Sequence, residues 1–94
     1  MKIQEIYYSS HFQRAFQKLP KTIKQKAAQK DKVPGGEKIF RLDCFHSSLK
    51  THKLKGEFTD FWAFSIDYSH RILFEFDEEN SCTFIDVGTH RIYD

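Results

Sequence analysis

Hydrophobic and polar positions follow a helical spacing in the first part of the chain. The opening segment, residues 2–8, reads KIQEIYY and is rich in β-prone residues, which predicts a first strand. The next apolar residues recur every three or four positions, as in a helix with one buried stripe. They are Phe12, Ala15, Phe16 and Leu19. Ser10, with Gln13 three residues later, is typical of a capping box at the start of that helix.

A proline separates this helix from a second one. Pro20 suits the first turn of a helix and disfavours helical backbone at Leu19, so we expect two antiparallel helices, the second over residues 20–32. The second helix has a thin apolar stripe and is otherwise covered by lysines. The run Val33-Pro34-Gly35-Gly36 then predicts a turn or loop. Ile39, Leu42 and Phe45 indicate a short helix over residues 37–45.

Alternation with a period of two dominates the rest of the chain and predicts four strands. They are residues 49–55, 61–67, 71–76 and 82–87. Short polar turns join them, which favours an antiparallel meander. With the first strand and the helices in front, the predicted class is α+β: an N-terminal strand and a helical hairpin packed on an antiparallel β-meander, in one domain over residues 1–94. Trp62 shares a face with Phe64 and Ile66, which favours the core over a base-stacking role.

The composition is that of a chain able to build its own core, since 16% of its residues are aromatic. Two cysteines, Cys44 and Cys82, form no disulfide framework or CxxC motif. The first ten residues have no apolar segment typical of a signal peptide, and no run approaches the roughly 20 apolar residues of a membrane span. We therefore expect a cytoplasmic protein with reduced thiols and no membrane partner.

The charge is distributed unevenly although the net charge is only +2. Residues 1–56 hold 13 Lys+Arg against 4 Asp+Glu, whereas residues 57–94 hold 2 against 9. This asymmetry indicates a basic face for an anionic partner, but lysines that simply solvate helix surfaces would give the same count.

Several kinds of site have no support in the sequence. The chain has no GxxxxGK[ST] or GxGxxG loop, no HExxH motif and no nucleophile elbow. Its five histidines lack metal-ligand spacing, and His46 with His52 is a weak zinc pair. We therefore predict no metal and no cofactor.

What remains is a set of imidazoles and cations at the predicted strand ends. The set comprises His52, Lys53, Lys55, His70, Arg71, His90, Arg91 and, nearby, Tyr93. In an antiparallel meander, alternate strand ends meet at one edge of the sheet. Metal-free RNA cleavage needs a base for the 2′-OH, an acid for the leaving 5′-oxygen and a cation for the phosphate. Histidine suits both proton roles near neutral pH, and arginine binds two phosphate oxygens at once.

Each of these residues also has a plainer interpretation. A single histidine at a strand end is more often a surface or capping residue. Arg71 could pair with Asp67 or Glu75, while Lys53 and Lys55 could form an ordinary solvated strand face.

The motifs along the chain resemble the RelE/ParE superfamily of bacterial toxins. The similar runs are LKTHKLKG from Leu49, FWAFSI from Phe61, RILF from Arg71 and DVGTHRIY from Asp86. The helix–Leu19-Pro20–helix opening also fits, so the resemblance covers nearly the whole chain. It implies a RelE-like microbial ribonuclease-type fold and a cognate antitoxin partner. In the RelE, YoeB and YafQ branches it further implies an endoribonuclease that cuts mRNA on the ribosome without a metal.

The resemblance assigns roles to individual residues. His52 precedes the LKG motif where those nucleases carry a proposed general base, and His90 matches their proposed general acid. Arg71 matches their phosphate-contacting arginine. Lys53 and Lys55 lie in a stretch that faces RNA in RelE-like members, and Tyr93 lies near a functional terminal aromatic of some members.

The chain also departs from the family pattern. Ser65 and Ser69 stand where the YafQ branch has a further His and an Asp, and the segment 33–36 looks like an insertion. Two alternatives therefore stay open beside the endoribonuclease. One is a ParE-like toxin that inhibits DNA gyrase, and the other is an inert relative that only binds an antitoxin.

Overall fold

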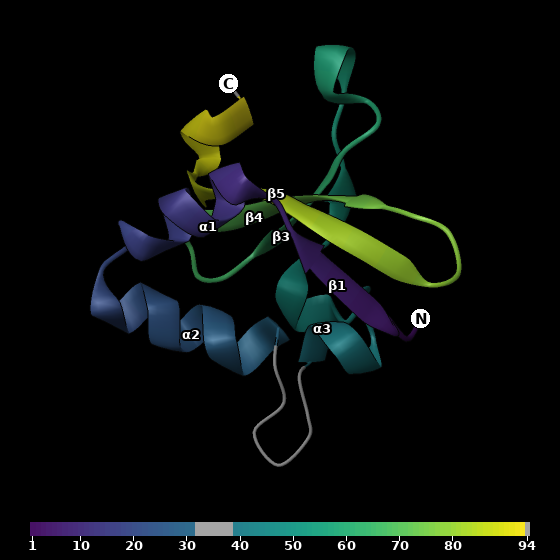
Figure 1. The fold of residues 1–94 in the computed structure, drawn as a ribbon, viewed down its shortest axis with the longest axis horizontal. Helices are drawn as coiled ribbons and strands as arrows, with labels where there is room; N and C mark the ends of the chain where they lie inside the picture. Colours follow the sequence, from purple (N-terminus) through teal and green to yellow (C-terminus); the bar gives the residue numbers. More distant parts are fainter. Residues whose placement is uncertain (32–38, 94) are drawn as a thin grey trace.

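The described residues form five strands, three α-helices and three 3₁₀ turns (Figure 1). The computed structural model describes residues 1–31 and 39–93, apart from the side chains of residues 28–31, 90 and 93. The strands are β1 (Glu5–Tyr8), β2 (His52–Lys53), β3 (Trp62–Ser65), β4 (His70–Phe76) and β5 (Ser81–Thr89). The helices are α1 (Ser10–Gln17), α2 (Lys21–Asp31) and α3 (Ile39–Leu42). The 3₁₀ turns are η2 (Ser47–Leu49), η3 (Gly56–Phe58) and η4 (His90–Tyr93).

All five strands form one sheet in the order β1-β5-β4-β3-β2. The last four pair antiparallel in sequence, which confirms the predicted meander and the α+β class. β1 lies beside β5 and runs parallel to it, with Glu5 opposite Ser81 and Tyr8 opposite Phe84. The first strand therefore extends the sheet beyond the end of the meander, an arrangement that local alternation does not reveal.

The helices and the sheet enclose an aromatic core. Phe40 of α3 stacks on Phe64 of β3 with ring centroids 4.6 Å apart, and it meets Phe74 and Phe84 edge-on. These four rings are fully buried. Trp62 is half-buried against Phe45 and Phe76, so its predicted place in the core is confirmed. Such pairs add stability beyond the area that they bury.

The opposite face of the sheet has a smaller apolar cluster. Leu54, Ala63 and Leu73 are buried there, and partly buried side chains of η3, η4 and their flanking segments pack on them. In the view of Figure 1, α2 and α3 lie below the sheet and η4 lies above it. The two faces therefore differ in cover, because the α-helices lie on one face and the turns η3 and η4 lie on the other.

The first helix begins one residue earlier than the predicted capping box. Ser9 is the N-cap, and its Oγ accepts a hydrogen bond from the Phe12 N–H at 3.0 Å. The same hydroxyl donates to the Ile85 carbonyl, which ties the start of α1 to β5. The Gln13 amide donates to the Tyr8 carbonyl, so the predicted box of Ser10 with Gln13 is wrong by one position.

The predicted strand over residues 49–55 is much shorter in the structure. Residues 47–49 form the η2 turn, and Lys50 follows it in the left-handed region with φ of 52°. Only His52 and Lys53 pair with β3 as strand β2, and Gly56, with φ of 70°, ends the extended segment. A left-handed residue reverses the chain direction, so alternation alone overestimated this strand.

Other element boundaries differ from the predicted ones for local reasons, and one predicted loop lies outside the described residues. β3 ends at Ser65 because the following Asp67 builds a turn, and α3, described over Ile39–Leu42, ends before the predicted limit at residue 45. The segment 33–36 lies outside the described residues. No described helix is long and apolar enough to span a membrane.

Candidate functional site

Strand register places two of the predicted site residues on one face of the sheet. His52 lies opposite Ala63 on β3, and Arg71 lies opposite Ser65, two positions further along the same strand. Opposite residues in an antiparallel pair point to the same face, as do residues two apart. His52 and Arg71 therefore both belong to the face that carries the small apolar cluster, away from the helices.

The C-terminal turn reaches the same end of the sheet. Arg71 lies opposite Gly88 on β5, and His70 lies opposite Thr89. His90 follows directly as the first residue of η4, so its backbone is adjacent to the β4 strand end. The side chains of His90 and Tyr93 lie outside the described residues, and their predicted roles remain predictions.

Gly88 leaves the space that η4 needs in order to fold back onto the sheet. A Cβ atom at Gly88 would lie 2.8 Å from Cγ2 of Ile92, closer than real Cβ contacts. Ile92 packs on the small apolar cluster and anchors η4 to the sheet. The glycine of the GTH run thus sets the position of the His90 backbone.

His52 has a defined tautomer. Its Nδ1 lies 2.9 Å from the Lys50 carbonyl oxygen. Because a carbonyl only accepts, Nδ1 carries a proton, and in the neutral ring Nε2 keeps its lone pair. Lys50 presents this carbonyl from the left-handed cap of η2. An exposed imidazole with an acceptor Nε2 has the form that a general base requires.

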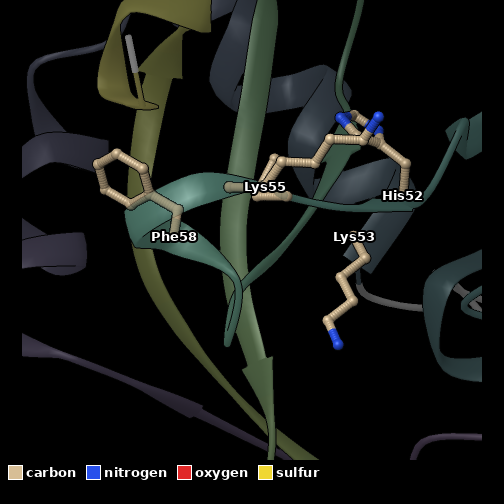
Figure 2. Close-up of a pocket in the computed structure, with 5 residues that line it drawn as sticks. His52, Lys53, Lys55 and Phe58 are labelled. Carbon is tan, nitrogen blue, oxygen red and sulfur yellow. The ribbon is translucent and has the colours of Figure 1, made fainter.

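A shallow hollow of about 230 Å³ lies beside His52 (Figure 2). His52, Lys53, Leu54, Lys55 and Phe58 line it. Figure 2 shows Lys55 extending toward the side where the His52 ring lies, whereas Lys53 points the other way. The register agrees, because Lys53 lies opposite Trp62, which packs on the helix-side core. The two lysines thus lie on different sides of the segment.

Arg71 is held by main-chain carbonyls. Its Nη1 donates to the carbonyl oxygens of Asp67 at 2.9 Å, Tyr68 at 3.0 Å and His70 at 3.1 Å. Among the described residues, every hydrogen bond of the Arg71 side chain uses Nη1, and none uses Nη2 or Nε. These contacts are hydrogen bonds to main-chain carbonyls, and they differ from the alternative of an ion pair between Arg71 and Asp67 or Glu75.

Asp67 builds the turn that holds Arg71. Its Oδ1 accepts from the N–H groups of Ser69 at 2.9 Å and His70 at 2.8 Å, and lies 3.1 Å from His70 Nδ1. Partial burial works to raise the Asp67 pKa, but the hydrogen bonds from His70 and Ser69 outweigh it and leave the pKa lowered. Lys26 of α2 lies 3.9 Å from Oδ2. An Asp that starts a tight turn is the signal that could have predicted this role.

A second hollow, of about 280 Å³, adjoins Arg71. It is lined by Ser48, Lys50, Ser65, Asp67, Tyr68 and Arg71. Lys50 therefore joins Arg71 as a second cation, and sequence reasoning did not single it out. Apart from the Asp67 carboxylate, whose Oδ1 already accepts two hydrogen bonds in its turn, the hollow combines two cations with hydroxyl groups, a donor set suited to a phosphate.

The remaining described histidines have structural contacts. His11 Nε2 lies 3.0 Å from Asp86 Oδ1, and His46 Nδ1 accepts from the Ser48 N–H at the start of η2. Among the described residues, no group of three or more His, Cys, Asp or Glu side chains is placed to hold a metal ion. That the protein works without a metal remains a prediction.

No protein-family model matches the chain, and no curated protein matches it in sequence. Solved structures do match over nearly its whole length. A YoeB/ParE toxin from Agrobacterium tumefaciens is 14% identical, with a TM-score of 0.73 over 93% of this chain and 99% of the toxin. The RelBE2 toxin–antitoxin complex from Mycobacterium tuberculosis matches at 14% identity, with a TM-score of 0.72 over 96% and 94%. YafQ from Escherichia coli matches at 14% identity, with a TM-score of 0.68 over 97% and 99%. The chain therefore has the fold of the RelE, YoeB and YafQ toxins.

Proposed function

We propose that this protein is the toxin of a type II toxin–antitoxin pair and cuts mRNA on the ribosome as a metal-independent endoribonuclease. The observation that carries the proposal is that His52 and Arg71 lie on the same face of a toxin-like sheet, the face with the small apolar cluster, here called the open face. The backbone of His90 follows Thr89, which lies opposite His70 at the start of β4. The fold alone is shared by toxins of more than one activity, so the proposal rests on these residues.

His52 would act as the general base. Its Nε2 takes the proton of the 2′-OH, and the 2′-oxygen attacks the adjacent phosphorus. The bond between phosphorus and the 5′-oxygen breaks, and His90 donates a proton to that oxygen. The products are one RNA end with a 2′,3′-cyclic phosphate and one with a 5′-hydroxyl. The hydrogen bond from His52 Nδ1 to the Lys50 carbonyl supports the base role because it holds the ring in the required tautomer.

Arg71 would stabilise the negative charge that gathers on the phosphate. Its Nη1 is anchored to three carbonyls, so the guanidinium is preorganised and pays little entropy when it binds. Lys50 adds charge beside it. Lys53, Lys55 and Tyr93 complete the proposed RNA-binding set, and Lys55 has the more favourable placement of the two lysines because it extends toward His52 (Figure 2).

The proposed partners are a cognate antitoxin, the ribosome and mRNA. Three of the matching structures are complexes with a partner protein, one of them the RelBE2 toxin–antitoxin complex, which supports a protein partner for this fold. The basic first part of the chain supports an anionic partner, because fixed positive charge steers RNA and acidic peptides alike.

The test is cleavage of mRNA on translating ribosomes, read by primer extension. We expect the wild-type protein to cut in the A site and His90→Ala to abolish the cut. Intact mRNA with the wild-type protein would overturn the proposal. A gyrase supercoiling assay then identifies a ParE-like toxin, while antitoxin binding without either activity identifies an inert relative.

A further inference from the structure

Tyr68 is the most exposed large hydrophobic side chain of the described residues, and the proposed mechanism does not use it. It is 92% exposed on the turn between β3 and β4, and no described ring contacts its own. Most exposed aromatic rings in soluble proteins lie at least partly against the surface, because apolar area in water is unfavourable. A ring displayed in this way on the proposed RNA face therefore calls for an explanation.

The turn that displays Tyr68 is well ordered by hydrogen bonds. Asp67 accepts from the N–H groups of the two residues after Tyr68, and the Tyr68 carbonyl accepts from Arg71. The backbone on both sides of the ring is thus fixed before any ligand arrives. A tyrosine side chain on a fixed backbone has only two torsions, so ordering it on binding costs little entropy.

Tyr68 stands between two hollows that both contain cations. One is the hollow of Lys50 and Arg71, which Tyr68 also lines. The other, of about 430 Å³, is lined by Tyr68, Ser69, Thr89 and Arg91. Tyr68 therefore lines both hollows, and each hollow has at least one cation in its lining.

Among the described residues that line the two hollows, Asp67 is the one carboxylate, and it does not cancel this positive charge. The Asp67 side chain lines the first hollow, but its Oδ1 already accepts from two N–H groups and lies near the His70 ring. Its Oδ2 faces Lys26 of α2. The described residues that line the two hollows therefore include three cations and one carboxylate that is already hydrogen-bonded.

We propose that Tyr68 stacks on a base of single-stranded RNA while the phosphates on either side of that nucleotide occupy the two hollows. The alternation of cation, aromatic ring and cation matches the alternation of phosphate, base and phosphate along an RNA strand. Stacking accepts every base, so Tyr68 would position the strand for cleavage rather than select a sequence. The inference rests on the proposed function and adds a binding residue to the same face.

Binding of a non-cleavable RNA tests the inference without the chemical step. The probe is a short single-stranded RNA with 2′-O-methyl groups and 2-aminopurine at each position in turn, whose fluorescence falls when the base stacks. We expect wild-type protein and Tyr68→Phe to quench one position, and Tyr68→Ala to bind about 5- to 100-fold more weakly without that quenching. Tyr7→Ala is the matched control, because Tyr7 is also exposed but lies on β1 at the far edge of the sheet.

A second variant tests the phosphate contacts. Arg91→Gln should weaken binding of the same RNA and reduce the dependence of log affinity on log salt by roughly 0.7, the value for one phosphate contact to a single strand. An unchanged slope would overturn the placement of a phosphate in the Arg91 hollow.

The outcomes separate this inference from the proposed function. Cleavage on ribosomes by the wild-type protein, with equal RNA affinity for Tyr68→Ala and Tyr68→Phe, would overturn only the inference. Weaker antitoxin binding by Tyr68→Ala, with unchanged RNA binding, would also overturn it and assign the ring to a protein contact. No cleavage of mRNA by the wild-type protein would overturn the proposed function, and absence of RNA binding would overturn the inference.

Discussion

The same strands build both faces of the sheet, but the two faces carry different kinds of side chain. The helix-covered face carries Phe64, Phe74 and Phe84, which are fully buried with Phe40. The other face carries the small cluster of Leu54, Ala63 and Leu73, with charged and imidazole side chains around it. Because side chains alternate along a strand, one residue can build the core while its neighbour meets the substrate. If the proposed function holds, a single position in the sequence separates residues that stabilise the fold from residues that act on RNA.

The largest effect on stability should come from the helix-covered face. Phe74→Ala removes a ring that contacts Phe40, Phe64 and Phe84, and leaves a cavity. We expect the free energy of unfolding to fall by about 3–5 kcal/mol. Urea denaturation followed by circular dichroism measures this. A loss below about 1 kcal/mol would show that the core can close over the missing ring.

A substitution on the open face should instead lower activity strongly and stability little. His52→Ala removes the proposed base, and we expect ribosomal mRNA cleavage to slow by roughly 10²- to 10⁴-fold. Stability should change by less than about 0.5 kcal/mol, because the ring is exposed. His11→Ala is the matched control, since it removes an exposed histidine from α1. Equal cleavage rates for the two variants would remove His52 from the mechanism.

Gly88→Ala should disturb the connection between the open face and η4. The added Cβ would press on Ile92, so we expect η4 to shift and cleavage to fall by roughly 10²-fold. Overpacking should also lower the free energy of unfolding by about 1–3 kcal/mol. The double variant with Ile92→Ala relieves the contact and should recover part of the stability. If the two changes add without coupling, the contact does not position η4.

Local sequence patterns predicted most of the fold, but few of the contacts that hold the site residues in place. Alternation predicts the meander because each strand alternates between two differently covered faces. The parallel pairing of β1 with β5 joins segments far apart in sequence, and no local pattern encodes it. Arg71 could be chosen as a phosphate ligand, but its anchors are main-chain carbonyls that any residue could supply. The display of Tyr68 likewise depends on the geometry of a turn.

The Asp67 turn should give stability a specific dependence on pH. The Asp67 pKa is lowered in the folded chain because hydrogen bonds from His70 and Ser69 to its charged form outweigh the effect of burial. A group with a lowered folded pKa contributes stability above its unfolded value, and this contribution is lost as the pH falls below about 4. Asp67→Asn should therefore make the free energy of unfolding depend less on pH between about pH 5 and pH 3. Urea titrations over that range provide the measurement, and parallel curves for the two proteins would contradict it.

The smallest expected effect is a change in RNA affinity, and it compares the two faces directly through two neighbouring lysines. Lys53 and Lys55 are two residues apart and carry the same charge, but Lys55 extends toward His52 while Lys53 points away (Figure 2). Lys55→Ala should weaken binding of single-stranded RNA several-fold and lower the salt slope by about 0.7, the value for one phosphate contact. Lys53→Ala should change both less, because only long-range attraction is lost. Fluorescence titration of a labelled RNA at several salt concentrations measures both quantities. Equal losses for the two variants would mean that RNA reaches both sides of this segment, and that the open face is not the only one that meets the substrate.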